Sequence, residues 1–293
     1  MSSFCFIVTE KCNWNCPYCE FPTIKNPRET SIEILSKHLP YIKDTLRKLG
    51  HLVVFTDVAG GEVGLLPLET LRYFFQTLDY PMVVSTNGKF MENNYHTDPI
   101  IRPYIKGLWY HVCPEPGKFK ISHNYEDDKI LINKGIVHNN INEIIAFINM
   151  NENIEFGYVE LEFDFDKDME PDYKMYYELY NKIKDLPNVT ENAKHIIYGR
   201  LNEKKMLRDN CRNFNTTVVL DLVNERILLC HRSQLNYIPL TQENLSKRLV
   251  TFPKDLFKGQ TECDSCTRLF AGKFSGGGII ETFFKTRRLL NEN

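Results

Sequence analysis

Short apolar runs alternate with amphipathic stretches over about the first 200 residues of the chain. The apolar runs are rich in Val, Ile and Phe, which favours buried β-strands. The amphipathic stretches carry apolar residues three and four positions apart, as on one face of a helix. We expect strands at residues 4–10, 52–58, 81–86, 107–113, 154–165 and 193–199. We expect helices at residues 30–49, 67–78, 141–148 and 176–183. The stretch from 113 to 140 fits neither pattern.

The stretch at residues 30–49 carries both a start signal and a breaking signal for a helix. Thr30 and Glu33 have the spacing of a capping box, in which two side chains satisfy the first free backbone amides of a helix. Pro40 lies inside the same stretch, where its ring should kink or break the helix. We therefore expect a helix that starts near Thr30 and is disturbed in its middle.

Strands that alternate with helices predict an α/β fold, since parallel strands need a crossover that a helix usually supplies. The parallel sheet is then either open or curved like a barrel. In the C-terminal third of the chain the pattern changes, and residues 218–222 and 226–230 predict a β-hairpin, with a further helix near the C-terminus. We therefore divide the chain into domains at residues 1–203 and 204–293.

The composition is that of an ordinary globular chain, with 293 residues of which 42% are hydrophobic. The formal net charge of −2 and a pI near 6.5 give no basic footprint, so nucleic acid is not an expected partner. No window approaches the roughly 20 apolar residues of a membrane span. The N-terminus lacks the basic and apolar regions of a signal peptide. We expect a cytoplasmic protein without a membrane partner.

Nine cysteines are many for a cytoplasmic chain, and most of them are clustered. In a reducing compartment, such clusters indicate metal or redox sites and not disulfides. The first set, with CxxxCxxC spacing, is Cys12, Cys16 and Cys19. The second set is Cys211, Cys230, Cys263 and Cys266. A structural zinc site is closed by four ligands, so the three cysteines of the first set leave a position open for a further ligand.

The CxxxCxxC spacing directly after a strand resembles the cluster motif of the radical S-adenosylmethionine (SAM) superfamily. The resemblance implies a partial (β/α)6 TIM-like barrel and a [4Fe-4S] cluster bound by Cys12, Cys16 and Cys19. It implies that the fourth iron binds SAM and that one electron from the cluster cleaves SAM to a 5′-deoxyadenosyl radical. It also implies an electron donor of the flavodoxin or ferredoxin type. The alternative is a three-cysteine zinc site completed by a distant His.

Residues that follow the second expected strand carry the resemblance further. Gly60, Gly61 and Glu62 resemble the family's glycine-rich segment that meets the methionine amino group of SAM. Glycines let the backbone approach a ligand closely, and a carboxylate suits an ammonium group. The resemblance therefore makes these residues candidate SAM-binding residues.

Residues 85–88, after the next expected strand, read STNG. This third motif resembles a sequence that is common after the same strand in the family. Ser85 and Asn87 are its candidate cofactor-binding residues. Tyr18, directly before the third cysteine, matches the family's aromatic position beside the adenine of SAM. Either GGE or STNG alone would be an ordinary turn, but a zinc site explains neither of them.

The second cysteine set can close a cluster completely, which suits electron transfer better than substrate binding. It resembles the twitch domain, the shortened relative of the SPASM domain, which carries one auxiliary [4Fe-4S] cluster in radical SAM enzymes. The C-terminal domain is then a small β-hairpin plus helix domain that binds this cluster. A structural zinc bound by the same four cysteines is the alternative, since C-x2-C spacing also suits zinc.

Several further side chains are weighed as site residues. Glu160 and Glu162 alternate with apolar residues, so in a barrel they point inward, toward SAM or substrate. Arg200 ends the last expected strand, where it either lies near SAM or substrate or pairs with a surface carboxylate. His111 and Cys113 end the fourth expected strand, in a region that contacts SAM in the family, although a His at a strand end is more often structural.

The resemblance leaves several reactions open. An auxiliary cluster that accepts an electron from the substrate radical would give net oxidation of a small molecule or peptide, as dehydrogenation or crosslink formation. A peptide epimerase is an alternative, but it needs a hydrogen-atom donor such as Cys113. A non-catalytic iron–sulfur binding protein is an alternative from another class, and the intact GGE argues against it.

Overall fold

A single sheet runs through the part of the chain that the computed structural model describes, namely residues 2–16, 18–112, 123–162, 171, 173–202, 217–228 and 237–250. Its nine strands follow the order β6-β5-β4-β3-β2-β1-β7-β8-β9. The strands are β1 (Ser2–Thr9), β2 (Val53–Gly60), β3 (Met82–Thr86), β4 (Ile105–His111), β5 (Leu131–His138), β6 (Tyr158–Leu161), β7 (Thr217–Asp221), β8 (Arg226–Leu228) and β9 (Tyr237–Pro239).

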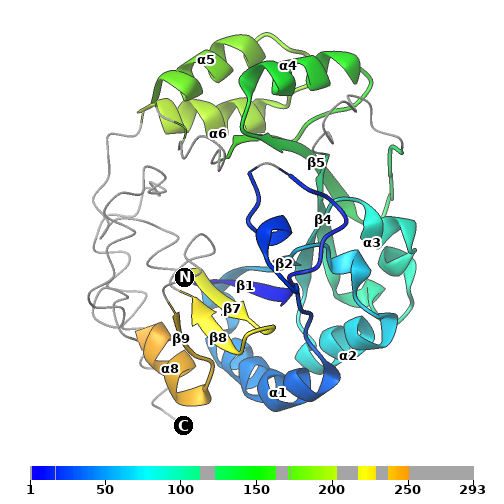
Figure 1. Cartoon of the computed structure of the whole chain (residues 1–293), viewed down its shortest axis with the longest axis vertical. Coiled ribbons are helices and arrows are strands. Elements are labelled where there is room, and N and C mark those ends of the chain that lie inside the picture. The colour runs from blue at the N-terminus through cyan, green and yellow to red at the C-terminus, as the bar shows by residue number, and fades with distance from the viewer. Residues whose placement is uncertain are drawn as a thin grey trace.

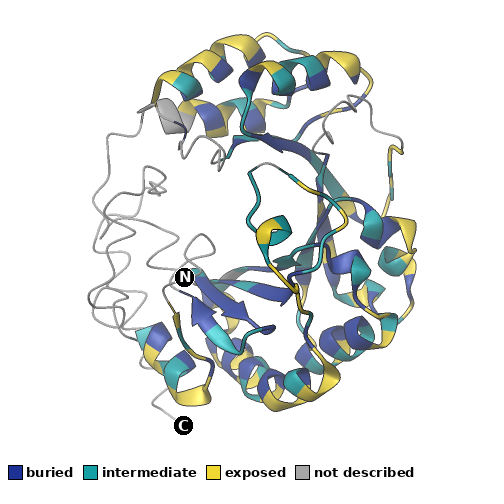
Figure 2. Ribbon diagram, in the orientation of Figure 1, coloured by how far each residue is buried: buried dark blue, intermediate teal, exposed yellow. Residues whose placement is uncertain are grey.

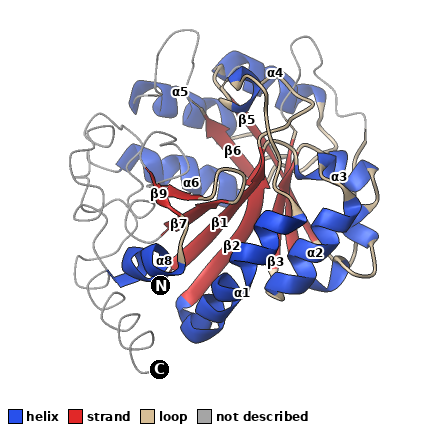
Figure 3. Cartoon of the chain, turned by 60° about the horizontal axis from the view of Figure 1, so that its bottom comes forward, coloured by secondary structure: helices blue, strands red, loops and turns tan. Residues whose placement is uncertain are grey.

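Helices lie around the outside of this sheet (Figures 1 and 3). The helices are α1 (Ile32–Leu49), α2 (Leu68–Leu78), α3 (Lys89–Glu92), α4 (Ile141–Met150), α5 (Tyr173–Ile183), α6 (Glu191–Asn202) and α8 (Gln242–Val250). Short 3-10 helices connect some of these elements, at Phe21–Thr23, Gly50–Leu52, Val63–Leu65, Tyr95–Thr97 and Arg102–Tyr104. Strands β1 to β6 pair in parallel, which confirms the α/β fold predicted from the sequence.

The sheet is curved, and three aromatic side chains contact one another on its concave side. Phe55 on β2 stacks on Trp109 on β4, with ring centroids 5.1 Å apart, and Tyr158 on β6 lies 6.3 Å from Trp109. In a flat sheet, strands two positions apart are separated by about 9.5 Å. Layers of side chains from alternate strands are typical of barrel interiors. The close approach therefore fits a sheet that bends around this face, as Figure 1 shows.

The main hydrophobic core lies between the convex face of the sheet and the helices (Figure 2). Phe4 and Phe6 alternate along β1 and are fully buried on this side. Phe6 meets Phe74 of α2 edge to face at 5.7 Å, and Phe74 meets Phe75 in the same way at 5.4 Å. Burial of large aromatic side chains contributes much of the stability of such a core. Strand β1 is thereby fixed beneath α1 and α2.

Helix α1 begins one residue later than its capping box predicts. Ser31 is the N-cap, and its hydroxyl accepts a hydrogen bond from the Ile34 backbone amide. Thr30 instead donates its hydroxyl to the Leu222 carbonyl at 3.3 Å. Pro40 does not break the helix, which runs to Leu49. Its exposed position places the missing backbone hydrogen bond on the solvent side, where water can satisfy the freed carbonyl.

Two elements differ from their sequence-based expectations. Strand β5 lies within the stretch from 113 to 140 that fitted no pattern, because polar residues interrupt it and Leu131 is exposed. The expected strand at 193–199 is wrong, because this segment belongs to helix α6. Among the helix residues whose burial is described, Ala193 and Ile197, four positions apart, are buried. The Thr190 hydroxyl accepts a hydrogen bond from the Ala193 backbone amide at 3.2 Å.

The expected strand at 154–165 is shorter, since β6 covers Tyr158–Leu161. The predicted hairpin is confirmed, with β7 and β8 antiparallel. Strand β7 also pairs in parallel with β1, so the hairpin extends the same sheet and lies beside the N-terminal strand. The domain division at residue 203 stays a prediction. None of the helices in the described residues is both long and apolar enough to cross a bilayer.

Truncating Phe74 tests the contribution of the core between β1 and α2. We expect Phe74→Ala to lower the free energy of unfolding by about 3–5 kcal/mol, because it removes a buried ring and leaves a cavity. Gln76→Ala on the exposed side of the same helix is the control, with an expected change within about 0.5 kcal/mol. Urea unfolding measures both, and equal effects of the two variants would contradict this description of the core.

Candidate functional site

The loop that carries the first three cysteines leaves the carboxyl end of β1 and returns to α1. Its two stems are paired. The Glu10 backbone amide donates a hydrogen bond to the Arg28 carbonyl at 2.8 Å, and Thr9 and Glu29 form an isolated antiparallel β-bridge. The Thr30 amide also donates to the Val8 carbonyl at 3.0 Å. The loop is therefore closed at its root, and we call residues 10–28 the cysteine loop.

The three thiols of the cysteine loop are half-buried and reduced. The Cys19 amide donates to the Cys16 carbonyl at 3.0 Å, and the Trp14 amide donates to Cys12 Sγ at 3.4 Å. Burial raises the pKa of Cys19 to about 12, and the negative charges of Cys16 and Cys12 add to the rise. Burial also raises the pKa of Cys12, and the negative charge of Cys16 adds to this rise. The three sulfurs are thus close enough to influence one another.

The glycine pair after β2 lies directly against the start of the cysteine loop. The Gly61 amide donates to the Thr9 carbonyl and the Glu62 amide to the Lys11 carbonyl, both at 2.7 Å. A Cβ atom on Gly60 would lie 2.3 Å from the Thr9 oxygen, and one on Gly61 would lie 2.1 Å from the Lys11 oxygen. Gly60 also has a φ of +132°. Only glycine permits this approach, so the two glycines hold the loop by their backbone.

Glu62 is fully buried and joins the GGE and STNG motifs. Its Oε1 accepts from the Gly64 amide and the Thr86 hydroxyl, each at 2.8 Å, and its Oε2 accepts from the Asn87 amide at 2.6 Å. Burial raises the pKa of this carboxyl, although the hydrogen bonds oppose the rise. A carboxylate has about four acceptor sites. Glu62 therefore spends most of its hydrogen-bonding capacity on the protein itself.

The STNG motif reaches the cysteine loop through Asn87. Its Nδ2 donates to Asn13 Oδ1 at 2.9 Å and lies 3.8 Å from Cys12 Sγ. Ser85 is half-buried in β3. The three motifs that the sequence singled out thus meet at the carboxyl ends of β1, β2 and β3, which is where parallel sheets bind ligands.

Tyr18 lies beside a histidine that the sequence did not single out. Its ring meets His138 edge to face, with centroids 6.2 Å apart. His138 ends β5, and its two ring nitrogens contact the Asn140 amide at 3.0 Å and Glu143 Oε2 at 3.2 Å. Because β5 itself was not expected, no pattern in the sequence marked His138 as a strand-end residue.

His111 and the two glutamates lie farther along the sheet. Burial lowers the pKa of His111 to about 4, although the charge of Glu162 opposes the shift. The His111 ring lies edge to face with Tyr158 at 5.5 Å. Tyr176 of α5 donates to Glu160 Oε1 at 3.4 Å. The Glu162 amide donates to the His138 carbonyl at 3.1 Å, so β5 and β6 end side by side.

Some predicted site residues are not described. Arg200 lies within helix α6 and not at a strand end, which corrects the position on which its role was argued, and its side chain is not described. The residues outside the described part are Cys113, Cys211, Cys230, Cys263 and Cys266. Their roles stay predictions.

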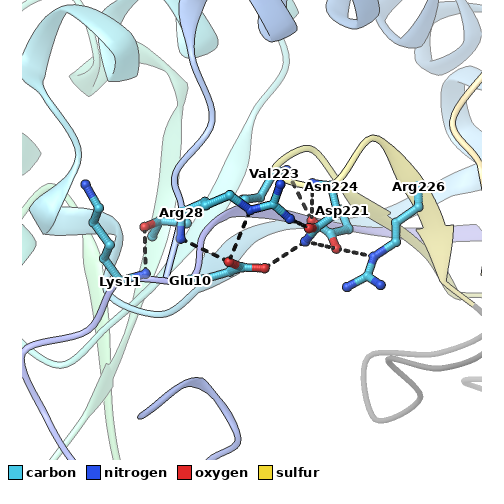
Figure 4. Close-up of polar contacts among 8 residues, drawn as sticks. Glu10, Lys11, Arg28, Asp221, Val223, Asn224 and Arg226 are labelled. Carbon is cyan, nitrogen blue, oxygen red and sulfur yellow. Dashed lines mark hydrogen bonds and ion pairs between the residues drawn. The ribbon is translucent and has the colours of Figure 1, made fainter. Parts of the chain in front are cut away.

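A polar network that the sequence did not indicate braces the cysteine loop from the side of the hairpin (Figure 4). Asn224 in the β7–β8 turn donates to Glu10 Oε1 at 2.8 Å, and Arg28 donates to Asn224 Oδ1. Asp221 accepts from Asn224 Nδ2 at 2.8 Å and from Arg226 Nε at 2.7 Å. Glu10 and Asn224 are 214 positions apart, so no local signal could reveal their contact.

A half-buried thiol and a buried carboxyl face each other on β1 and β2. Cys5 pairs in register with Asp57, and their side chains are hydrogen-bonded. Burial raises the pKa of Asp57 to about 7, and the contact with Cys5 opposes the shift. Burial also raises the pKa of the Cys5 thiol. Near neutral pH this carboxyl is therefore partly protonated in the folded state.

The fold is similar to solved structures of other proteins. No protein-family model matches the chain, and no curated protein matches it. Native anSMEcpe with bound AdoMet and Cp18Cys peptide is 14% identical, with a TM-score of 0.50 over 99% of this chain and 98% of that one. Native anSMEcpe with bound AdoMet and Kp18Cys peptide is 16% identical, with a TM-score of 0.51 over the same shares. At these identities, the likeness shows a shared fold.

A third structure, BtrN in complex with AdoMet and 2-DOIA, is 13% identical and covers 100% of this chain and 87% of that one. Its TM-score of 0.36 is too low to indicate a common overall fold.

The raised pKa of Asp57 predicts a pH dependence of stability. The folded state holds a proton that the unfolded state releases above its ordinary pKa of 3.8, so the carboxyl stabilises the fold at low pH and destabilises it as the pH rises to about 7. Relative to Asp57→Asn, wild type should lose up to about 4 kcal/mol of unfolding free energy over this range. Urea unfolding at several pH values measures this, and parallel pH profiles would contradict the burial of a neutral carboxyl.

Proposed function

We propose that the chain is a radical SAM enzyme. The observation that carries the proposal is the meeting of CxxxCxxC, GGE and STNG at the carboxyl ends of three neighbouring parallel strands, β1, β2 and β3. The motifs are up to 75 positions apart in sequence and contact one another through Asn87 and Cys12. The likeness of the fold to anSMEcpe, whose structures contain AdoMet and peptides, supports the same proposal.

The cysteine loop suits a [4Fe-4S] cluster held by Cys12, Cys16 and Cys19. No three His, Cys, Asp or Glu side chains in the described ranges lie close enough together to hold one metal ion. Cluster-binding cysteines each bind a different iron, so their sulfurs lie farther apart than the ligands of a single ion. Burial and mutual repulsion disfavour the metal-free thiolates, and a cationic cluster would relieve both costs. When bound, the cluster would supply the electron that cleaves SAM.

The chain's own residues would bind and orient the cofactors. Asn87 can donate a hydrogen bond to Cys12 Sγ, which lowers the electron density on a thiolate ligand. The backbone of Gly60 and Gly61 fixes the start of the loop, beside which the methionine part of SAM would lie. Tyr18, with His138 behind it, would lie along the adenine. Other proposed contacts to SAM are Glu62, Ser85, His111 and Glu160.

The C-terminal cysteines would hold an auxiliary [4Fe-4S] cluster that accepts an electron from the substrate radical. The proposed reaction is therefore net oxidation of a small molecule or peptide, as dehydrogenation or crosslink formation. The bound peptides in anSMEcpe favour a peptide. Electrons would come from a flavodoxin or ferredoxin. Glu162, Arg200 and Cys113 are the candidate residues for contact with the substrate.

Removing single cysteines tests the proposed division of labour. After anaerobic reconstitution, Cys16→Ala should abolish formation of 5′-deoxyadenosine from SAM under dithionite, since it removes a ligand of the SAM-binding cluster. Cys263→Ala should retain cleavage of SAM and lose product. Cys5→Ser, in which a hydroxyl still faces Asp57, is the control and should cleave SAM as wild type does. Wild type that binds iron without forming 5′-deoxyadenosine would instead indicate an iron–sulfur binding protein.

Heavy water separates oxidation from epimerisation. In an oxidation the substrate loses its hydrogen and takes none back, so the product should carry no solvent deuterium at a stereocentre. An epimerase returns a hydrogen atom from an exchangeable donor such as a thiol, which would introduce deuterium. Mass spectrometry of the product, together with the ratio of 5′-deoxyadenosine to product, distinguishes the two. Deuterium at an inverted centre would exclude net oxidation.

A further inference from the structure

The turn of the β7–β8 hairpin reaches into the root of the cysteine loop. Asn224 Nδ2 donates a hydrogen bond to Glu10 Oε1 at 2.8 Å, and Asn224 Oδ1 accepts one from the Arg28 guanidinium. Glu10 and Arg28 are the first and last residues of the loop, and the Arg28 amide also donates to Glu10 Oε2 at 3.0 Å. One amide side chain therefore contacts both stems at once, as Figure 4 shows.

Asn224 is itself held in place by a buried carboxylate. Asp221 accepts the Asn224 backbone amide at 3.1 Å and its side-chain amide at 2.8 Å. Asp221 also accepts Arg226 Nε at 2.7 Å, and its side chain is 2% exposed. Hydrogen bonds to buried charged groups are strong, and an unpaired buried charge is costly. The hairpin thus presents the Asn224 amide in a fixed orientation.

Glu10 depends on this amide, because its own side chain is only 9% exposed. Its Oε2 is satisfied by the Arg28 backbone amide, whereas its Oε1 receives the hydrogen bond from Asn224. Without Asn224, one oxygen of a nearly buried carboxylate would lose its donor and would turn toward water. Glu10 lies two positions before Cys12, so this movement would displace the first cysteine.

We propose that Asn224 is a positioning residue for the three cysteines, so that the C-terminal hairpin sets the geometry of the N-terminal cluster loop. The inference rests on the proposed function, which gives the three cysteines their role as cluster ligands, but it is a statement about the position of the cysteine loop. The glycine pair holds the loop from the β2 side and Asn224 holds it from the β7 side. The hairpin is then a part of the cluster site, although it contributes no ligand from its described residues.

The neighbouring residue supplies a matched control. Glu225 in the same turn pairs with Lys37 and with His38 Nε2, which lies at 2.7 Å, and both partners belong to α1. Glu225→Gln therefore weakens the attachment of the turn to α1 without removing a contact to the cysteine loop. Asn224→Ala removes the contacts to Glu10 and Arg28. The two variants separate positioning of the loop from general attachment of the hairpin.

The first measurement uses the metal-free chain. Iodoacetamide alkylation mapped by mass spectrometry should be several-fold faster at Cys12, Cys16 and Cys19 in Asn224→Ala than in wild type, because a loosened loop exposes its thiols. Cys5 in β1 is the internal reference, and its rate should not change. Glu225→Gln should match wild type at the loop cysteines. Equal rates in wild type and Asn224→Ala, or the same acceleration in both variants, would overturn the proposal.

The second measurement uses the anaerobically reconstituted chain. Changing a group that orients metal ligands typically costs about 10–100-fold in metal affinity or activity. Asn224→Ala should hold its iron at least about tenfold more weakly against a chelator and should change the EPR spectrum of the reduced cluster, and Glu225→Gln should do neither. If wild type fails to cleave SAM, the proposed function fails, whereas the alkylation comparison still decides the role of Asn224.

Discussion

The close backbone contact between the end of β1 and the glycine pair after β2 is the constraint on which the rest of the site depends. Two amides of the second segment donate to carbonyls of the first, at a separation that leaves no room for a side chain on Gly60 or Gly61. The start of the cysteine loop is thereby a continuation of the β1–β2 pairing. The sheet therefore holds the start of the cysteine loop in a fixed position, although the cysteines themselves lie within the loop.

The buried carboxylate of Glu62 extends this constraint to the next strand. It accepts hydrogen bonds from Gly64, Thr86 and Asn87, so the ends of β2 and β3 are fixed relative to each other. Asn87 then faces the cysteine loop with a side chain whose position is set by its own backbone bond to Glu62. In the sequence, the glutamate was a candidate partner for an ammonium group. The structure adds a second role, since Glu62 joins two motifs that would otherwise be separate turns.

The sequence predicted those parts of the fold and site that depend on local patterns. Strands with uninterrupted apolar runs, such as β1 and β2, and helices with clear faces, such as α1 and α2, were predicted closely. The three motifs lie at strand ends, as expected, and their roles in binding stay predictions. Strand β5 was missed because its burial comes from the neighbours β4 and β6 and not from its own alternation. Helix α6 was mistaken for a strand because adjacent Ile196 and Ile197 resemble a buried run, although only Ile197 is buried. His138 and Asn224 could not be found, since their contacts join elements distant in sequence.

The pairing of β7 with β1 has a consequence for how the chain is made. During synthesis, β1 is made before the other strands of this sheet and can pair with β2 as soon as that strand appears. Among the described residues, its other edge is covered by β7, whose residues are made after strands β1 to β6. An uncovered strand edge is a template for pairing with other chains. A nascent chain of this protein therefore carries an open strand edge beside its cysteine loop until β7 has been made.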